Sequence, residues 1–226
     1  MFEVRKAMPL VGAAALAATL IATPAQASGD QTGAAMSGLS PAKCKTKALI
    51  KNGSFEKPKL GAGTAWALYD EDDVQAWMTN DPADKVEIWS NTMGVQPKDG
   101  VQLLELNATG KGNSIYQDIR TAPGTRVYWE MYIRARDTTG AADFDTTQIH
   151  FGATPPMNSG GVNGVGSIFS YANSASEIQW KRLYGWYKIA SGQKWTRVTV
   201  TALSSATNAN GYGNLVDNVR VWSQSC

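Results

Sequence analysis

Apolar and polar residues alternate in three segments near the middle of the chain, Gln102–Ala108, Ser114–Thr121 and Arg126–Arg136. In the third segment every second residue is apolar: Val127, Trp129, Met131, Ile133 and Ala135. A period of two places successive side chains on opposite faces, which is the pattern of half-buried β-strands. Turn-forming residues such as Ala122-Pro123-Gly124 separate the segments. Strand, turn and strand at this spacing predict an antiparallel sandwich or barrel.

Shorter segments on either side show a similar period. In chain order they are Val86–Ser90, Asp145–Gly152, Arg182–Ala190, Trp195–Leu203 and Leu215–Trp222. In the last of them, Leu215, Val219 and Val221 are assigned to one face. No helical period is sustained after residue 27, so the pattern predicts an all-β fold built as an antiparallel β-sandwich.

The N-terminal residues differ from the rest of the chain. Arg5 and Lys6 precede an apolar run, Val11–Ile21, and a small-x-small site, Ala25-Gln26-Ala27. This combination predicts a secretory signal peptide over residues 1–27, too short to span a membrane as a helix. Ser28–Lys43 is rich in small residues and predicts a flexible leader. Residues 44–226 are then one sandwich domain of a secreted, extracellular protein.

The two cysteines, Cys44 and Cys226, flank the predicted domain. Exported proteins are oxidised, so an even pair is most simply one disulfide, with two free thiols as the alternative. A bridge requires the two Cα atoms to lie within about 7 Å of each other. The first and last strands of a sandwich can be neighbours, which would satisfy this requirement.

The charge of the chain argues against nucleic acid and anionic membranes as partners. The formal net charge is +2 and falls to +1 when residues 1–27, with Arg5, Lys6 and Glu3, are removed. A nearly neutral surface gives no electrostatic basis for binding nucleic acid or anionic membranes. No segment after the signal peptide is long and apolar enough to insert into a membrane, and a monomer is expected.

Several short motifs, taken in order, resemble the galactose-binding-like jelly rolls of secreted bacterial proteins, a superfamily that includes many carbohydrate-binding modules. These motifs are Asn52-Gly53-Ser54-Phe55-Glu56, Val86-Glu87-Ile88-Trp89, Glu105-Leu106-Asn107, Tyr116-Gln117-Asp118, Thr121-x-Pro123-Gly124 and Leu215-Val216-Asp217-Asn218-Val219. The resemblance implies a jelly-roll sandwich and a carbohydrate ligand. The segment Thr154–Lys181 is not part of the resemblance, and its role stays open.

The same resemblance implies a structural calcium ion that joins the two ends of the fold. Its carboxylate ligands would be Glu56 and Asp217, with backbone carbonyls near Gly53, and calcium prefers such oxygen ligands. The alternative is that Glu56 caps a turn and Asp217 makes an ordinary hydrogen bond. The acidic run Asp70–Asp73 lacks the spacing of an EF-hand loop and is interpreted as solvated.

Aromatic and polar residues on the outward positions of the strands are candidates for sugar binding. The chain contains eight Trp and eight Tyr, whose rings can stack on the C–H faces of sugars while polar side chains bind the hydroxyl groups. The candidate carbohydrate-binding residues are Glu87, Trp89, Glu105, Asn107, Tyr132, Arg134 and Trp186. Alternatively, the rings pack in the core or over a sheet edge, and Glu105 and Asn107 only anchor loops.

The leading hypothesis is a secreted, non-catalytic protein that binds carbohydrate, such as a cell-wall or plant polysaccharide. A protein-binding adhesion module and a polysaccharide hydrolase are the alternatives. A glycosidase needs two carboxyl groups across a cleft, and no spacing pairs Glu87, Asp99, Glu105 or Glu130 in this way. The only histidine is His150, and no Gly-x-Ser-x-Gly motif accompanies it. Catalysis therefore stays an open question, with the non-catalytic hypothesis preferred.

Overall fold

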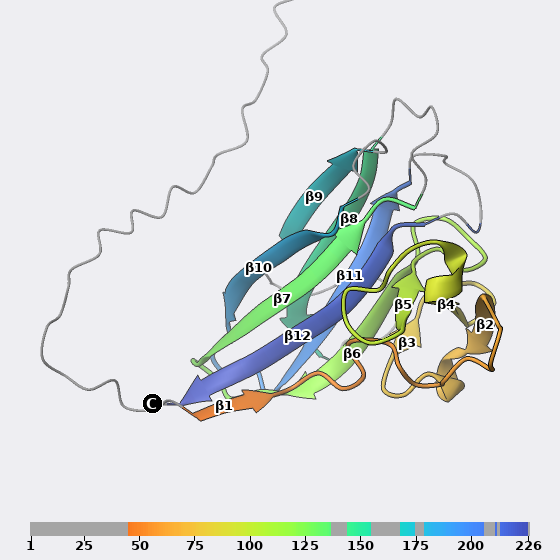
Figure 1. The fold of residues 1–226 in the computed structure, drawn as a ribbon. Coiled ribbons are helices and arrows are strands. Elements are labelled where there is room, and N and C mark those ends of the chain that lie inside the picture. The colour runs from red at the N-terminus through yellow and green to blue at the C-terminus, as the bar shows by residue number, and fades with distance from the viewer. Residues whose placement is uncertain are drawn as a thin grey trace, which may run out of the picture. The chain divides into compact units, whose positions relative to one another are not determined.

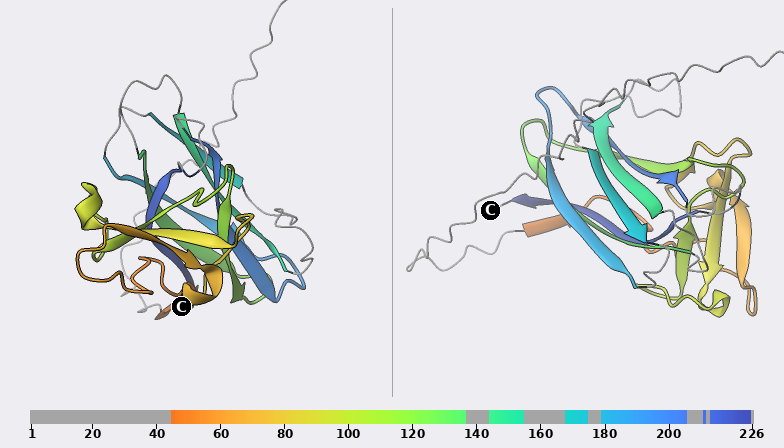
Figure 2. Two further views of the ribbon diagram at one scale, coloured as in Figure 1. Left: turned by 90° about the vertical axis from the view of Figure 1, so that its right-hand side faces the viewer. Right: turned by 90° about the horizontal axis from the view of Figure 1, so that it is seen from above.

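The computed structural model describes residues 45–136, 144–154, 168–174, 179–205, 211 and 213–225. Within these residues the chain forms two antiparallel β-sheets, which pack against each other as the layers of a sandwich (Figure 1). The views in Figure 2 show the same strands from two further directions. The predicted all-β architecture is therefore confirmed. No helix in this part of the chain is both long and apolar enough to cross a membrane.

The larger sheet is built from strands at both ends of the domain and in its middle. Its strands are β1 (Lys45–Ala48), β2 (Trp66–Asp70), β4 (Lys85–Ser90), β5 (Gln102–Glu105), β7 (Arg126–Arg134), β10 (Lys181–Lys188) and β12 (Leu215–Ser225). Their order across the sheet is β10-β7-β12-β5-β4-β2, and β1 pairs with β12. β12 is thus a central strand that connects the other members.

The smaller sheet lies on the other side of the core. Its strands, in the order in which they pair, are β3 (Met78–Thr79), β6 (Ser114–Arg120), β11 (Trp195–Ser204), β8 (Phe144–Ala153) and β9 (Ile168–Ser174). From β5 to β8 and from β10 to β12, consecutive strands alternate between the two sheets. This winding is that of a jelly roll, as predicted.

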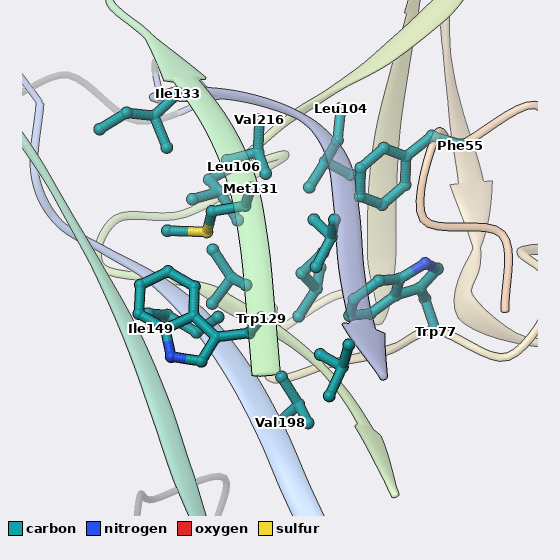
Figure 3. Packing of buried hydrophobic residues seen from close by; sticks show 14 of the residues in the cluster. Phe55, Trp77, Leu104, Leu106, Trp129, Met131, Ile133, Ile149, Val198 and Val216 are labelled. Carbon is teal, nitrogen blue, oxygen red and sulfur yellow. The ribbon is translucent and has the colours of Figure 1, made fainter. Parts of the chain in front are cut away.

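The core lies between the sheets and follows the predicted alternation. On β7, Val127, Trp129, Met131 and Ile133 are each at most 2% exposed. Figure 3 shows Trp129 and Met131 of this strand beside Ile149 of β8 and Val198 of β11. The outward residues of β7 therefore face away from the smaller sheet, on what we call the outer face of the larger sheet.

Four strands, β1, β2, β3 and β9, were not predicted from the hydrophobic pattern. All four residues of β1 are exposed, so this strand is defined by its backbone pairing with Lys45 opposite Ser225. β2 is the outermost strand of its sheet and pairs only with β4 in the described part. β5 ends at Glu105, before the predicted Ala108, because Asn107 has a φ of 65°, which an extended strand does not accommodate.

The assignment of Leu215 to the face of Val219 and Val221 is wrong. Leu215 packs on the outer face, whereas Val219 and Val221 lie in the main core. The cause is a register shift in β12 between Asp217 and Arg220, where Asn218 has a φ of 51°. Such an irregularity reverses the alternation of side chains along the strand.

Several predictions fall on residues outside the described ranges. These are the signal peptide (1–27), the leader (28–43) and both cysteines, Cys44 and Cys226. Most of Thr154–Lys181 also lies outside them. The disulfide stays a prediction, and the pairing of Lys45 with Ser225, the sequence neighbours of the two cysteines, is compatible with it.

Candidate functional site

Three aromatic residues lie in register across neighbouring strands on the outer face of the larger sheet. Trp186 of β10 is opposite Tyr128 of β7, and Tyr128 is opposite Trp222 of β12. The rings of Tyr128 and Trp222 are stacked, with centroids 6.1 Å apart and planes 22° apart. We call Trp186, Tyr128 and Trp222 the aromatic row. Because directly opposite residues share one face of a sheet, the row presents three large rings on one surface.

A second row, parallel to the first, is polar. Tyr184 of β10 is opposite Glu130 of β7, which is opposite Arg220 of β12. The Glu130 carboxylate accepts a hydrogen bond of 2.7 Å from Nε of Arg182. The guanidinium of Arg182 lies 4.7 Å from the centroid of the Tyr184 ring. Carboxylate, guanidinium and phenol groups are therefore held within two residues of the aromatic row.

A groove of about 490 Å³ adjoins the two rows where β12 lacks a continuous neighbour. On that side β12 pairs with β5 only at Leu215 and Val216, and with β1 only from Trp222 onward. The groove is lined by residues that include Ala48, Ile50, Gly53, Glu130, Arg220 and Trp222. We call the two rows and this groove the platform.

The outermost rings of the platform are open to solvent. Trp186 is 49% exposed and Tyr184 is 67% exposed. This exposure remains although the Arg126 guanidinium lies 4.4 Å from the centroid of the Trp186 ring. A ligand can therefore reach these rings without displacing any strand.

The opposite end of the same outer face is covered. Trp89 of β4 is only 3% exposed, because it packs with Leu103, Leu215 and Val95, against which Trp180 also packs. The indole nitrogen of Trp180 donates a hydrogen bond of 2.7 Å to the Gln96 carbonyl. We call Trp89, Val95, Leu103 and Leu215 the covered cluster. The prediction that Trp89 is outward is correct for its strand face, but the ring is not accessible.

Two carboxyl groups lie beside the covered cluster. Glu87 and Glu105 are directly opposite on β4 and β5, and they are 6% and 1% exposed. Trp89 Nε1 donates to Glu87 Oε1 at 2.8 Å, while Arg136 Nη1 and Gly213 N donate to Glu105 Oε1 at 2.6 and 2.8 Å. Burial raises the pKa of Glu105 to about 8, and the Glu87 charge adds to the increase. Burial likewise raises the pKa of Glu87.

This carboxyl pair does not have the arrangement of a glycosidase site. Such sites place two carboxyl groups about 5 to 10 Å apart in an open groove, with the sugar between them. Glu87 and Glu105 are instead buried cross-strand partners, and Arg136 also lies 4.9 Å from the centroid of the Trp89 ring. Together with Arg136, the two carboxyl groups join β4 and β5 to the segments that follow β7 and precede β12. The geometry therefore indicates a structural role for this pair.

The seven predicted sugar-binding residues are therefore divided among several places. Glu87, Trp89 and Glu105 lie at the covered end, and Trp186 lies in the aromatic row. Tyr132 and Arg134 lie between them on the outer face of β7, where Lys98 Nζ is 4.7 Å from the centroid of the Tyr132 ring.

The last member of the predicted set, Asn107, is separate from both regions. It is 3% exposed, and its side-chain oxygen accepts a hydrogen bond of 2.7 Å from Asn113 N. This contact agrees with the alternative of a loop anchor. Whether any of the seven residues contacts a sugar stays a prediction.

Sequence reasoning missed Trp222 and Arg220. A sequence signal was present, because Val219 and Val221 lie in the core and alternation then places Arg220 and Trp222 on the opposite face.

The predicted calcium ligands have hydrogen-bond partners in the structure. Asp217 Oδ2 accepts from the backbone N–H groups of Lys98 and Asp99 at 2.6 and 2.9 Å, and its Oδ1 accepts from Asn218 N at 2.6 Å. Glu56 Oε1 accepts from Val101 N and Gln102 N at 2.8 and 2.9 Å. The Gly53 carbonyl accepts from Val219 N at 2.8 Å.

Glu56 and Asp217 therefore form a hydrogen-bonded staple that ties residues 98–102 to both ends of the domain. Among the described residues, no group of three or more His, Cys, Asp or Glu is placed to hold a metal ion. The calcium prediction is not tested by these contacts.

The chain matches no protein-family model and no curated protein. It is similar in structure to a family 61 carbohydrate-binding module in complex with β-1,4-galactotriose, with 11% identity and a TM-score of 0.48 over 78% of this chain and 99% of that one. It is also similar to a xylan-binding domain from Paenibacillus barcinonensis, with 15% identity and a TM-score of 0.45 over 82% and 100% of the two chains. A family 35 carbohydrate-binding module from Clostridium thermocellum is also similar, with 15% identity and a TM-score of 0.40 over 71% of this chain and 99% of that one. All three identities are at most 15% and all three TM-scores are below 0.5.

Proposed function

We propose that this protein is a non-catalytic carbohydrate-binding protein whose platform holds a polysaccharide chain. The observation that supports the proposal is the aromatic row, Trp186, Tyr128 and Trp222, in register across three strands and next to a groove. A row of rings on a rigid sheet offers apolar surface for several consecutive sugar rings. Little side-chain entropy is lost on binding, because aromatic rings have few rotatable bonds.

The polar row supplies the second half of sugar recognition. Sugar hydroxyl groups need donors and acceptors, and Glu130 and Arg220 line the groove beside Trp222. Hydrogen bonds that involve an ionised group are roughly twice as strong as neutral ones. Together, the stacked rings and the charged side chains match a ligand with apolar faces and many hydroxyl groups.

Binding is tested by affinity gel electrophoresis and calorimetry against soluble polysaccharides, with xylan and β-1,4-galactan in the panel. Replacement of Trp186→Ala is expected to weaken binding at least about tenfold, the loss typical of a central aromatic contact. Trp222→Ala should have a similar effect. Retained binding in both variants, or no binding by the wild-type protein to any polysaccharide, contradicts the proposal.

Two other exposed tryptophans provide matched controls. Trp66 and Trp195 are 48% and 46% exposed, close to the 49% of Trp186. Trp66 lies on β2 at the far end of the larger sheet, and Trp195 lies on β11 of the smaller sheet. Trp66→Ala and Trp195→Ala should leave the affinity unchanged. If they reduce it as strongly as Trp186→Ala, the binding surface is elsewhere.

The proposal also includes the secretion of the protein and the oxidation state of its cysteines. We propose that residues 1–27 direct secretion, because a positive start, an apolar run and a small-x-small site follow one another there. We also propose that Cys44 and Cys226 form a disulfide, because exported proteins are oxidised. Protein recovered from culture medium should begin after Ala27 and should resist thiol alkylation until it is reduced. A monomer in gel filtration is expected. Loss of thermal stability on treatment with EDTA would support the calcium site, whereas an unchanged melting temperature would leave the hydrogen-bonded staple.

A further inference from the structure

Two cations face each other at the end of the platform. Lys188 of β10 and Arg126 of β7 are directly opposite in register, and each lies two residues along its strand from Trp186 or Tyr128. Successive outward residues of a strand are two positions apart, so both cations lie on the outer face beside the aromatic row. Both side chains are exposed.

No carboxylate of the described residues pairs with either cation. This distinguishes them from the other arginines of the platform. Arg182 is bound to Glu130, and Arg220 Nη2 lies 3.7 Å from Asp99 Oδ2. Like charges directly opposite each other on a sheet destabilise it. Carboxylates compensate the charges of Arg182 and Arg220, but none among the described residues compensates this pair.

The Arg126 guanidinium is already placed for binding. It lies 4.4 Å from the centroid of the Trp186 ring, and this cation–π contact orients the side chain over the row. Directly opposite residues have Cβ atoms about 5 Å apart. One carboxylate or sulfate group can therefore contact both cations while its sugar ring lies on the aromatic row.

We propose that the platform is specific for anionic polysaccharides, with sugar rings stacked on Trp186 and Tyr128 and an acidic substituent held between Arg126 and Lys188. This inference rests on the proposed function, because it assigns a ligand class to the same surface. The shared chemistry is a polysaccharide with regularly spaced negative charges, supplied either by uronic acid carboxylates or by sulfate esters.

The test compares ligands that differ only in charge. Polygalacturonate and its fully methyl-esterified form have the same rings, but the ester has no carboxylate. The wild-type protein should bind polygalacturonate at least about tenfold more tightly than the ester, and the difference should shrink at high salt because exposed charges are screened. A sulfated galactan and its desulfated form make up the second pair and show which acidic group is preferred.

The variants test the position of the contact. Lys188→Gln and Arg126→Gln should each reduce affinity for the anionic ligand by about three- to tenfold and leave binding to the neutral form unchanged. Lys194→Gln is the matched control, because Lys194 is an exposed lysine in the turn before β11. Far-UV circular dichroism and the melting temperature verify that each variant is folded.

Each result bears on one of the two proposals. Equal binding of charged and neutral ligands, abolished by Trp186→Ala but unaffected by Lys188→Gln, overturns the anionic specificity and leaves carbohydrate binding in place. An equal loss in Lys194→Gln overturns the specificity as well, since the attraction is then general. No binding to any polysaccharide overturns both proposals. Binding to the sulfated galactan alone keeps the anionic class and assigns the sulfate ester.

Discussion

The outer face of the larger sheet has two ends with similar composition and different surroundings. One end presents Trp186, Tyr128 and Trp222 in an open row, and the other places Trp89 under Val95 and Trp180. Both ends combine aromatic rings with arginine and glutamate. At the open end Arg126 is exposed and without a carboxylate partner among the described residues, whereas Arg136 at the covered end binds Glu105.

The difference lies in the loops and not in the strands. The segment between β4 and β5 turns back over the outer face, where Val95 packs on Trp89 and the Gln96 carbonyl binds Trp180. Asp217 holds the same segment by accepting hydrogen bonds from Lys98 and Asp99. In the described part of the chain no comparable segment packs on the aromatic row. The same kind of ring therefore contributes to folding at one end and remains available for a ligand at the other.

The largest expected contrast is between two tryptophans. Trp89→Ala removes a buried ring and should lower the free energy of unfolding by about 3 to 5 kcal/mol. Trp186→Ala removes a ring that is 49% exposed, and its effect on stability should be much smaller. Urea unfolding of both variants measures the contrast. Equal losses would mean that the two ends do not differ in the way the structure indicates.

The next contrast is between two glutamates with arginine partners. Glu105→Ala removes the acceptor of Gly213 N and the carboxyl partner of Arg136, which keeps its hydrogen bond to the Gly211 carbonyl. This loss at a buried position should cost about 3 kcal/mol or more. At the open end, Glu130→Ala leaves Arg182 without its carboxylate partner, but the Arg182 side chain is 53% exposed and can bind water instead. The loss in urea unfolding should therefore be smaller for Glu130→Ala, and a reversed order would contradict the assignment of the two ends.

The covered end should also make stability depend on pH. The pKa of Glu105 is raised from 4.5 to about 8, so between these values the native state retains a proton that the unfolded state releases. Stability must then fall as the pH rises through this window. Asp217, with a pKa raised by burial from 3.8 to about 7, acts in the same direction.

The urea midpoint is therefore expected to be lower at pH 8.5 than at pH 5. Glu105→Gln should flatten this dependence, because the amide does not titrate, while it still accepts a hydrogen bond through its oxygen. A wild-type midpoint that rises with pH would contradict the prediction.

The smallest expected effect concerns the hydrogen-bonded staple that Asp217 forms with the segment between β4 and β5. In Asp217→Asn one carboxylate oxygen becomes an NH₂ group, so the side chain loses an acceptor for at least one of the backbone N–H groups of Lys98, Asp99 and Asn218. An unsatisfied buried donor costs about 1 to 3 kcal/mol. Hydrogen exchange of the Lys98 and Asp99 amides measures the change locally. Unchanged exchange would mean that Asp217 does not hold the covering segment.

A large part of the fold could be predicted from the residue pattern. The alternation in Arg126–Arg136 correctly identified the core residues of β7, because the period of two in a strand ties sequence position to sheet face. β1 could not be predicted, since its exposed residues carry no such pattern and it exists through pairing with β12. Leu215 was placed on the wrong face because the irregularity at Asn218 interrupts the period.

The candidate site was predicted less completely, and Trp89 and Trp186 illustrate the reason. Both were assigned to the outer face from their own strands, and both lie there. Alternation identifies the face of a side chain, which is a local property of the backbone. Whether that face is covered depends on segments distant in sequence, and here the loop after β4 and Trp180 cover one ring and leave the other open. The sequence alone therefore determined most of the strands and the face of most of their residues, and the tertiary structure decided which aromatic residues remained for a ligand.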